Sequence, residues 1–575
     1  MWTHLEHQEC SGRNHGLGRF AQPLNGRLIR KKMPNKKKKA PTKTIAKNVI
    51  KAVLGQVPFT AELYWMTRHR DKSLNSRFSL TRLKENLPAI CTYVSKMQNE
   101  DHEQGKNVFI FASLHYWIEH AAVTGLILSG MGNDVTLGYL PYHDWQNDIS
   151  RFDQRRQNLY AQEILKKAEP QLKSISLLDL HAGYKVLPDA LEEKIREVTN
   201  FDAMYTDQVE NVDEDSAIYK LRHKRNVKAA RAAYDYLDKN KPDIVIVPNG
   251  TIQEFGVIFE VAQFLNIEIV TYEFGDQRQR IWIAQNSKVM QQDTTAMWDA
   301  FKEDQLTRTE KEKIRELFEA RRKASVWKNF SRLWQHVPAQ GVEIARSELG
   351  LDDRPVVLLA TNVLGDSLTL GRKVFSNTME EWLERTLQYF VGKTEAQLII
   401  RIHPGEMLIH GQSMLEVINR VLPSLPDHIH VIGPEEKVNT YDLIAAADLG
   451  LVYTTTVGLE MAMSGVPVIV VGNTHYRERG FTHDPEGWVR YYKTINAILE
   501  DPSEYKLSAE KINLAWAYAY RFFFNFPLPF PYHLVNLWED YREMPIKELF
   551  KSSNWKEYET VFRYLAGEKI DWKAN

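Results

Sequence analysis

Cysteine is almost missing from this chain, which contains only Cys10 and Cys91 among its 575 residues. Two thiols exclude a disulfide framework and any metal site built from cysteines, and they fit a reducing compartment. No apolar run is long enough to span a bilayer, and the first residues lack the apolar centre of a signal peptide. We therefore expect a cytoplasmic protein, with peripheral attachment at the inner face of the cell membrane as the alternative.

Two glycine-rich phosphate-binding motifs are also missing. Neither GxGxxG nor GxxxxGK[ST] occurs, which argues against dinucleotide-dependent redox chemistry and P-loop hydrolysis. An excess of charge is missing too, because 74 Lys and Arg residues balance 74 Asp and Glu residues. No overall field favours nucleic acid, and no nucleic-acid partner is expected.

One local charge block stands out against this balance. Residues 27–51, RLIRKKMPNKKKKAPTKTIAKNVIK, hold eleven basic residues and no acidic one. Such a block is most often a solvated, disordered arm, and we assign residues 1–55 to one. The alternative is attraction to an anionic membrane surface, worth on the order of 1 kcal/mol per basic residue. The stretch TIAKNVIKAVLGQV would then form an amphipathic helix on that surface.

The rest of the chain reads as two successive α/β units. Apolar, β-rich runs at 107–114, 133–142, 242–250 and 267–275 alternate with helical patterns, and a second series runs from residue 354 to 472. Strand, helix, strand with short links is typical of a parallel sheet. The sequence therefore predicts an α/β fold of two tandem Rossmann-like doubly wound domains facing a cleft, with helical N- and C-terminal additions.

The predicted boundaries follow from these patterns. We expect residues 56–345 to form an N-terminal Rossmann-like domain with a helical insert at 154–239, and residues 307–349 to form a helical link. We expect residues 346–505 to form a C-terminal Rossmann-like domain. Residues 506–575 form a helical, aromatic tail that packs across both domains.

Polar residues follow the strands of the C-terminal unit, where ligands of such sheets bind. His403 and Arg401 of RIHPGE offer a hydrogen-bond donor and a positive charge to a phosphate. The stretch YTTTVGLE ends a strand and begins a helix, where free N–H groups and hydroxyls favour an anion, although the threonines also serve as helix caps. The donor-site and phosphate-site candidates are Asn362, Asp366, Arg401, His403, Tyr453, Thr454, Thr455, Thr456 and Glu460.

The N-terminal unit offers carboxylates and histidines at its own strand ends. Glu254 and Glu273 each follow a strand, and a carboxylate facing the cleft serves as an acid, base or nucleophile in group transfer. We rank these two first and add His115 as a third catalytic candidate, ahead of Glu119 and His120. For each residue the plain alternative is a helix cap or a surface charge. Asp213 and Asp215 in VDEDS match a loose Asp-x-Asp metal pattern, but a solvated acidic loop is the favoured interpretation.

Several motifs together resemble the bacterial capsule polysaccharide biosynthesis proteins, glycosyltransferases of the GT-B fold that include Kdo transferases. The matching stretches are LLATNVLGDS, RIHPGE and VYTTTVGLEMAMSGVPVIVVGNTHYRERGFT, together with IVPNG and TYEFG. The resemblance implies that His403 and Thr454 to Thr456 hold donor phosphate and that Glu460 contacts the nucleotide sugar. Asn362 and Asp366 would line the cleft. The resemblance also implies that residues 56–345 are the acceptor domain and residues 346–505 the nucleotide-sugar-binding domain. One departure is Gly365, which stands in LGDS where relatives often have an aromatic residue.

The sequence thus predicts a metal-independent glycosyltransferase without a cofactor. It would move a sugar from a nucleotide-activated donor, CMP- or CDP-linked, to a surface or capsular polysaccharide or glycolipid acceptor. Two alternatives stay open. One is a nucleotide-sugar 2-epimerase of the same architecture, and the other is a non-catalytic scaffold held at the membrane face by the basic arm.

Overall fold

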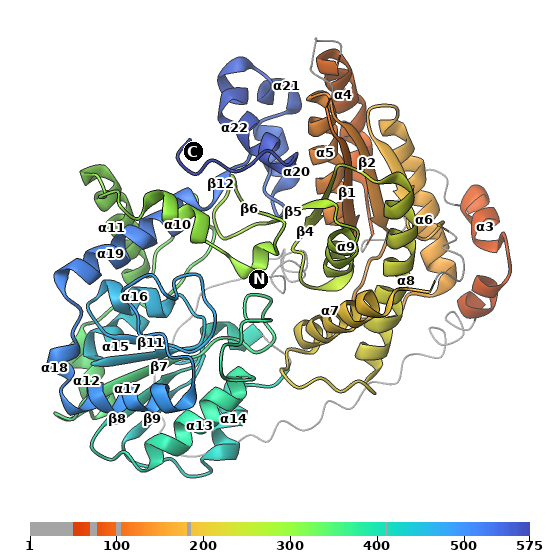
Figure 1. The fold of residues 1–575 in the computed structure, drawn as a ribbon. Coiled ribbons are helices and arrows are strands. Elements are labelled where there is room, and N and C mark those ends of the chain that lie inside the picture. The colour runs from red at the N-terminus through yellow and green to blue at the C-terminus, as the bar shows by residue number, and fades with distance from the viewer. Residues whose placement is uncertain (1–49, 69–77, 99–104, 181–185, 409–410, 575) are drawn as a thin grey trace, which may run out of the picture.

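Two β-sheets, one in each half of the chain, form the frame of the protein in the computed structural model (Figure 1). The structure describes residues 50–68, 78–98, 105–180, 186–408 and 411–574. Most of the predicted N-terminal arm, including the basic residues before Ile50, lies outside the described residues.

The N-terminal sheet has seven strands. In the order in which they lie side by side, they are β12 (Leu528–Pro529), β6 (Arg280–Gln285), β5 (Glu268–Glu273), β4 (Ile244–Pro248), β1 (Asn107–Ser113), β2 (Asp134–Leu140) and β3 (Lys173–Ser176). The five strands from β5 to β3 are parallel, and β6 and β12 add to one edge in antiparallel orientation. Strands β1 and β4 are buried on both faces, which explains their uninterrupted apolar sequences.

The helices described in this half of the chain include α3 (Thr60–Arg68), α4 (Thr81–Gln98), α5 (His115–Gly130), α6 (Arg151–Leu165), α7 (Asp189–Asp207), α8 (Ala217–Asn240) and α9 (Gln253–Phe264). Residues 50–56 are helical too, although the predicted disordered arm extends to residue 55. The predicted insert at 154–239 holds α7, α8 and most of α6, but it also contains β3. The insert is thus largely helical, with one short strand at Lys173–Ser176 that the sequence did not indicate. Its four residues, KSIS, include a single large apolar side chain, too few to show a strand pattern.

The C-terminal sheet is wholly parallel, with five strands. Side by side they are β11 (Val468–Val470), β10 (Leu449–Val452), β7 (Val356–Ala360), β8 (Gln397–Arg401) and β9 (Ile429–Ile432). The helices around it are α13 (Met379–Val391), α14 (Met414–Val421), α15 (Thr440–Ala446), α16 (Val457–Met463) and α17 (Trp488–Glu500). Two Rossmann-like units with helical additions are present, so the predicted α/β class is confirmed.

The link between the two sheets is less helical than the sequence suggests. It contains α10 (Thr295–Phe301), α11 (Arg308–Arg322) and α12 (Val342–Leu349), but residues 323–341 are not helical. The prediction of a helix through 307–349 is wrong for this segment. Its backbone forms hydrogen bonds with the stretch around Asp276 and Gln277 of the same chain instead of helical hydrogen bonds. The N–H of Ser331 donates to the carbonyl of Asp276 at 2.7 Å, and Phe330 bridges to Gln277.

The tail returns to both halves of the molecule. It comprises α18 (Pro502–Tyr505), α19 (Ala509–Tyr520), α20 (Leu537–Glu543), α21 (Ile546–Leu549), α22 (Ser552–Leu565) and the edge strand β12. Tyr518 and Phe522 are buried in a core with the C-terminal sheet, whereas Phe530 and Phe562 are buried with the N-terminal sheet. Among the helices that the structure describes, none has the length and apolarity needed to cross a membrane.

Candidate functional site

The strand order brings the predicted donor-site segments together at the carboxyl ends of three neighbouring strands. Strand β7 lies between β10 and β8, and its last residues bond to the ends of both neighbours. The side-chain oxygen of Thr361 accepts from the N–H of His403 at 3.1 Å. The side-chain oxygen of Asn362 accepts from the N–H of Thr454 at 3.2 Å. Asn362, His403 and the threonine run therefore share one rim of the sheet.

His403 is neutral and oriented. The N–H of Gly405 donates to its Nδ1 at 2.9 Å, so the ring proton belongs on Nε2. Burial lowers the pKa of His403 to about 4, and the nearby charge of Arg332 contributes in the same direction. Nε2 has no partner among the described residues. The side chain thus offers one N–H donor at the rim and no positive charge.

The two arginines near this rim have different surroundings. Arg401 is buried, and its guanidinium donates to the carbonyls of Gly433 at 2.7 Å and Val438 at 3.4 Å. These two hydrogen bonds fix the segment that follows β9. Arg332, by contrast, has a side chain that is 43% exposed and lies 3.9 Å from a carboxylate oxygen of Asp276. Arg332 is therefore more accessible than Arg401, and its charge acts on His403.

The threonine run makes few side-chain bonds of its own. The hydroxyl of Thr454 is buried without a partner among the described residues, and the hydroxyl of Thr455 accepts from the N–H of Val457 at 3.5 Å. Thr456 makes no side-chain capping bond to α16. Tyr453 is buried beside Trp382, with ring centroids 6.0 Å apart, and burial raises its pKa. Two of the three hydroxyls are thus left for another partner.

Glu460 and Asp366, the two carboxylates predicted at this site, lie in different settings. Glu460 is buried and forms an ion pair with Arg321 at 2.8 Å, while the Arg321 guanidinium stacks 4.0 Å from the ring centre of Trp334. Burial raises the pKa of Glu460, and the charge of Arg321 opposes that shift. Asp366 shapes the turn after β7, where its side chain accepts from the N–H of Leu368 at 2.9 Å. Glu460 therefore faces the core, and Asp366 lies on the rim loop.

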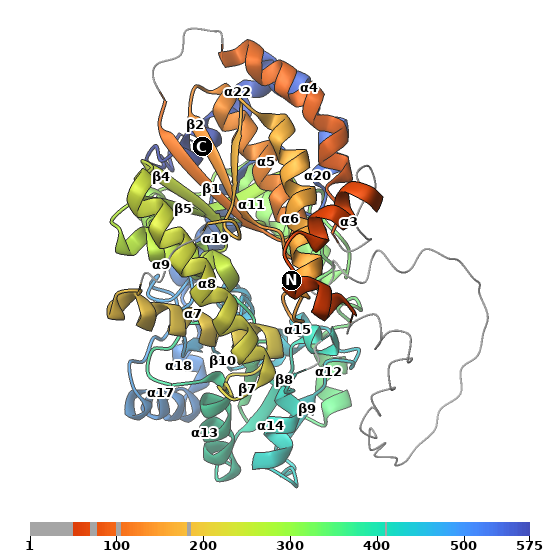
Figure 2. The same ribbon diagram turned by 90° about the vertical axis from the view of Figure 1, so that its right-hand side faces the viewer.

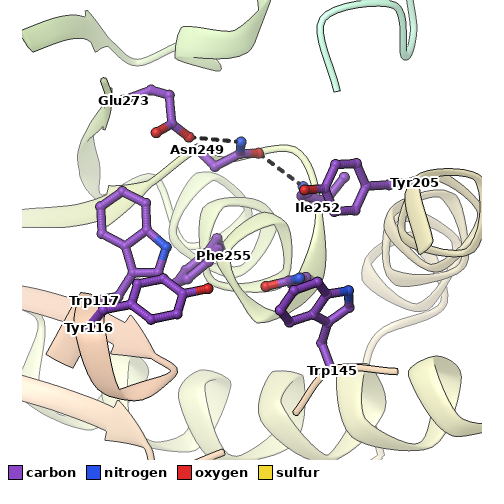
Figure 3. Close-up of a pocket in the computed structure, with 9 residues that line it drawn as sticks. Tyr116, Trp117, Trp145, Tyr205, Asn249, Ile252, Phe255 and Glu273 are labelled. Carbon is purple, nitrogen blue, oxygen red and sulfur yellow. Dashed lines mark hydrogen bonds between the residues drawn. The ribbon is translucent and has the colours of Figure 1, made fainter. Parts of the chain in front are cut away.

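In the N-terminal half, Glu273 lies in a small cavity whose other walls are largely aromatic. Figure 3 shows Glu273 and Asn249 at one side of this cavity, with aromatic rings from α5, α7 and the loop after β2 around them. The lining residues are Tyr116, Trp117, Trp145, Tyr205, Asn249, Ile252, Gln253, Phe255 and Glu273. Aromatic faces and a few polar groups are what sugar rings bind to in proteins, because a sugar presents both C–H and O–H groups.

The Glu273 carboxyl is held by two donors. The amide of Asn249 donates to one oxygen at 3.1 Å, and the N–H of Phe274 donates to the other at 3.0 Å. Asn249 is itself fixed, because its amide oxygen accepts from the N–H groups of Thr251 and Ile252 (Figure 3). Burial raises the pKa of Glu273 to about 7, and these two bonds oppose the shift. A carboxyl with a pKa near 7 exchanges protons readily at neutral pH.

Glu254, ranked beside Glu273 from the sequence, belongs instead to a buried ion network. Its carboxylate accepts from Arg222 at 2.9 Å and from the hydroxyl of Ser113 at 3.3 Å. Arg222 also pairs with Asp202 at 2.6 Å, and the side chains of Arg222 and Asp202 are fully buried. The charge of Glu254 is thus satisfied in the interior. Its neighbours Gln253 and Phe255 line the aromatic cavity, so Glu254 supports the wall of that cavity from behind.

His115 and its neighbours on α5 pack against other segments. Burial lowers the pKa of His115 to about 4, helped by the charge of His143, and its ring meets that of Phe78 edge to face. His115 does not line the cavity. Glu119 accepts from the indole of Trp538 at 2.8 Å, and His120 is bonded to the carbonyl of Tyr532 at 3.1 Å, so both anchor the tail.

The predicted acidic loop is exposed, as expected from its composition. Asp213 and Asp215 both face solvent, and Asp215 pairs with Lys220 at 2.8 Å. Among the described residues, no three His, Cys, Asp or Glu side chains gather closely enough to hold a metal ion.

Helix α7 lies between the N-terminal sheet and the C-terminal sheet (Figure 2). Its last turns contact both the cavity and the loop after β7. A Cβ atom at Gly365, in the loop after β7, would lie 2.3 Å from the carbonyl oxygen of Met204. The next residue, Tyr205, lines the cavity, and burial raises its pKa, with Tyr116, Asp366 and Glu273 adding to the shift. Asp366 from one sheet and Glu273 from the other thus lie close to the same phenol. The close approach also explains why glycine stands at position 365.

The residues that sequence reasoning missed are Arg332 and most of the aromatic cavity wall. Arg332 lies in an aperiodic part of the link, where nothing marks it beyond its charge. Tyr116, Trp145 and Tyr205 belong to three separate segments that meet only in the folded chain. The excess of aromatic residues near strand ends is the one signal in the sequence for such a wall.

Comparisons with known proteins bear on this site. The sequence model of the capsule polysaccharide biosynthesis protein family matches residues 284–496, which include the whole rim of the C-terminal sheet. No curated protein matches the sequence.

Solved structures resemble the chain only distantly. The KpsC β-Kdo 2,4 transferase of Thermosulfurimonas dismutans is 17% identical, with 48% of this chain and 78% of that chain covered and a TM-score of 0.31. The UDP-GlcNAc 2-epimerase of Neisseria meningitidis, bound to UDP-GlcNAc, is 13% identical, with 71% and 94% covered and a TM-score of 0.22. Scores this low carry no argument about activity. Over residues 284–496, however, the family match confirms the resemblance to capsule polysaccharide biosynthesis proteins that the sequence motifs indicate.

Proposed function

We propose that this protein is a metal-independent glycosyltransferase of the GT-B type. It moves a sugar from a nucleotide-activated donor, CMP- or CDP-linked, to a surface or capsular polysaccharide or to the glycolipid on which such a chain is built. One observation carries the proposal. Gly365, in the loop after β7, lies against Met204 of α7, and the next residue, Tyr205, lines the same aromatic cavity as Glu273, a carboxyl with a pKa near 7.

The donor would bind at the rim formed by β10, β7 and β8. The Nε2–H of His403 and the free hydroxyls of Thr454 and Thr456 are neutral donors for phosphate oxygens. Arg332 supplies the positive charge that the sequence assigned to Arg401. These groups stabilise the negative charge that grows on the phosphate as the glycosidic bond breaks.

The acceptor would bind in the aromatic cavity, with its hydroxyl against Glu273. In the transfer step the Glu273 carboxylate takes the proton of this hydroxyl, and the oxygen bonds to the anomeric carbon of the donor sugar. The bond from that carbon to the phosphate oxygen breaks, and its electron pair leaves with the nucleotide. Asn249 holds the carboxylate in place, and Glu254 with Arg222 supports the wall behind it.

Binding and turnover test the proposal separately. A thermal-shift screen with CMP, CDP, UDP and GDP identifies the nucleotide, because a ligand of the folded state raises Tm with its occupancy. NMR of the matching nucleotide sugar, with and without an acceptor glycan, then follows the reaction. Release of nucleotide that depends on the acceptor supports the transferase.

Two outcomes would contradict it. Conversion of a UDP-sugar to its 2-epimer without any acceptor would assign the protein to the epimerases. Absence of nucleotide binding by the folded full-length chain would leave the scaffold as the better interpretation. His403→Ala is the matched variant in each assay, since it removes a single donor from the rim.

A further inference from the structure

A patch of apolar side chains is exposed on the first described segment of the chain. Seven of the nineteen large hydrophobic side chains that the described residues expose lie between residues 50 and 66. They are Ile50 (58% exposed), Val53 (61%), Val57 (47%), Phe59 (78%), Leu63 (62%), Tyr64 (40%) and Met66 (65%). Single exposed hydrophobic residues are ordinary, but a contiguous group marks an interaction surface.

The spacing of six of these residues places them on one side of two short helices, whereas the ring of Tyr64 packs against Phe152 and Arg156 of α6. Residues 50–56 are helical, and Ile50, Val53 and Val57 follow one another at intervals of three and four. In α3, Leu63 and Met66 continue the same spacing from Phe59. Positions separated by three or four residues share a helix face, so each helix turns an apolar stripe to solvent. We call these two stripes, with Phe59 between them, the apolar patch.

The opposite side of both helices is fixed to the protein. Ala61 and Trp65 are buried against α6, and the indole of Trp65 donates to Glu163 at 3.2 Å. Lys51 pairs with Asp153 at 2.6 Å, and Glu62 pairs with Arg155. At Gly55 an added Cβ would lie 2.9 Å from the backbone N of Phe152, so the first helix also packs closely on α6. The apolar patch is therefore presented outward by a docked pair of helices.

The patch lies at the edge of the N-terminal half, outside α6 and away from the C-terminal sheet (Figure 1). None of its residues lines the aromatic cavity or bonds to the rim of β7. A role in the proposed transfer reaction does not explain it.

The charge of the adjoining sequence indicates what covers the patch. The eleven basic residues of 27–51 run directly into it, with no acidic residue among them. A chain of zero net charge thus carries a strongly positive stretch directly before the densest group of exposed apolar side chains among the described residues. An anionic bilayer surface offers both partners at once, phosphate headgroups for the lysines and acyl chains for the apolar side chains.

We propose that residues 50–66 form an interfacial anchor that inserts the apolar patch into a membrane carrying anionic lipid. Phe59, Leu63 and Met66 enter the boundary between headgroups and acyl chains. The anchor is independent of the proposed transferase activity, and it would hold the aromatic cavity near a membrane-bound acceptor.

Vesicle co-sedimentation of the full-length chain tests this anchor. Vesicles of phosphatidylcholine alone are compared with vesicles that also contain phosphatidylglycerol. The variant F59S/L63S/M66S removes the apolar contribution, and K36Q/K37Q/K38Q/K39Q removes part of the charge. The matched control V326S/I344S/L425S changes three apolar residues that are 52%, 44% and 41% exposed elsewhere. We expect binding to the anionic vesicles only, weakened about tenfold or more by each of the first two variants and unchanged in the control.

A fluorescent reporter shows which residues enter the membrane. NBD attached to Cys in F59C/C10S/C91S should brighten and shift to the blue on anionic vesicles, whereas the same dye in V326C/C10S/C91S should not. Retention of the wild-type Tm by all variants, and of any nucleotide-induced Tm shift, separates loss of anchoring from loss of folding or of donor binding.

Three results would overturn the anchor: no binding of the wild-type chain to anionic vesicles, equal binding by F59S/L63S/M66S, or no change in the dye at position 59. A concentration-dependent dimer of the wild-type chain in sedimentation velocity, lost in F59S/L63S/M66S, would instead assign the patch to a second copy of the chain.

Discussion

The backbone N–H of Gly405 donates to Nδ1 of His403 over 2.9 Å at the carboxyl end of β8. A nitrogen that accepts a hydrogen bond cannot also carry the proton, so this bond fixes the tautomer with hydrogen on Nε2. Because burial lowers the pKa of His403 to about 4, the ring stays neutral at physiological pH. His403 therefore acts as an oriented, neutral hydrogen-bond donor. A positive charge for binding phosphate must come from another residue.

The first prediction separates the two ring nitrogens of His403. The amide of Gln reaches the position of Nε2, whereas the shorter amide of Asn reaches that of Nδ1. If donation from Nε2 stabilises the phosphate, His403→Ala should lower kcat/KM by roughly 10²–10³-fold, the usual effect of one lost donor of this kind. His403→Gln should recover part of the loss, and His403→Asn should not. Steady-state kinetics with the donor identified by thermal shift measures this, and equal activity of the Gln and Asn variants would count against it.

The second prediction concerns Arg332, the exposed cation beside His403. Arg332→Ala should raise the donor KM by about ten- to a hundredfold, because a charged hydrogen bond contributes about 1.5–3 kcal/mol. Arg308→Ala is the control, since Arg308 is an exposed arginine of the same link that pairs with Glu312 at 2.9 Å. An unchanged donor KM in Arg332→Ala would remove this residue from the site.

Arg401 provides a contrast on the same rim. Because its guanidinium bonds to the carbonyls of Gly433 and Val438, Arg401→Gln should act mainly on Tm. The sequence could not distinguish the two arginines. Arg401 is the last residue of the buried strand β8, where ligands of such sheets bind, but the direction of its side chain depends on where the chain returns after β9.

The third prediction uses the raised pKa of Glu273, which is about 7 in the folded protein against 4.5 ordinarily. Between these values the folded state binds more protons than the unfolded state, so this group destabilises the fold progressively as pH rises through that window. Glu273→Gln should therefore raise the free energy of unfolding at pH 8 by roughly 1–3 kcal/mol and change it little at pH 4.5. Thermal unfolding at both pH values measures the difference.

Glu273→Gln should stabilise the fold but lower the catalytic rate. If Glu273 takes the proton of the acceptor, kcat/KM of the wild type should rise with pH through about 7. Glu273→Gln should lose about 10²–10⁴-fold in rate and no longer show that rise. Glu119→Gln is the control, because burial also raises the pKa of Glu119 to about 7 but its carboxyl is bonded to Trp538 and Leu83. A stabilised Glu273→Gln variant with full activity would exclude Glu273 as the base.

The fold was largely readable from the sequence because buried parallel strands need uninterrupted apolar runs, as in β1, β4, β7 and β8. The rim of the C-terminal sheet followed from the same reasoning, since residues after parallel strands meet at one edge. Strands β3 and β6 were missed because they are short or carry mixed polar residues, and their pairing depends on neighbours far away in the chain.

The chemical state of the site was not readable in the same way. Glu254 and Glu273 both follow strands in similar surroundings, yet one is neutralised by Arg222 and the other is left with two neutral donors. Arg222 lies 32 residues before Glu254 in α8, and no local pattern links them. Glu460 likewise meets Arg321 across 139 residues. Which carboxylate meets an arginine is decided by these distant pairings.

The last prediction tests the contact that joins the two halves of the site. Gly365 has a φ of +68°, and an added Cβ would lie 2.3 Å from the carbonyl oxygen of Met204, a backbone atom that cannot move aside cheaply. Gly350 has nearly the same φ, +64°, with nothing within 4 Å of an added Cβ. Gly350→Ala should therefore lower the free energy of unfolding only through left-handed backbone strain, by about 1–2 kcal/mol.

Gly365→Ala should cost more, by roughly a further 1–3 kcal/mol, because the loop after β7 must move away from α7. The same displacement would carry Asp366 away from Tyr205, so kcat/KM should fall in Gly365→Ala while Gly350→Ala stays close to wild type. Thermal unfolding and donor-saturated kinetics of the two variants, measured side by side, check both parts. Equal losses of stability would mean that Met204 and Gly365 do not meet in solution, and the two halves of the site would then have to assemble in another way.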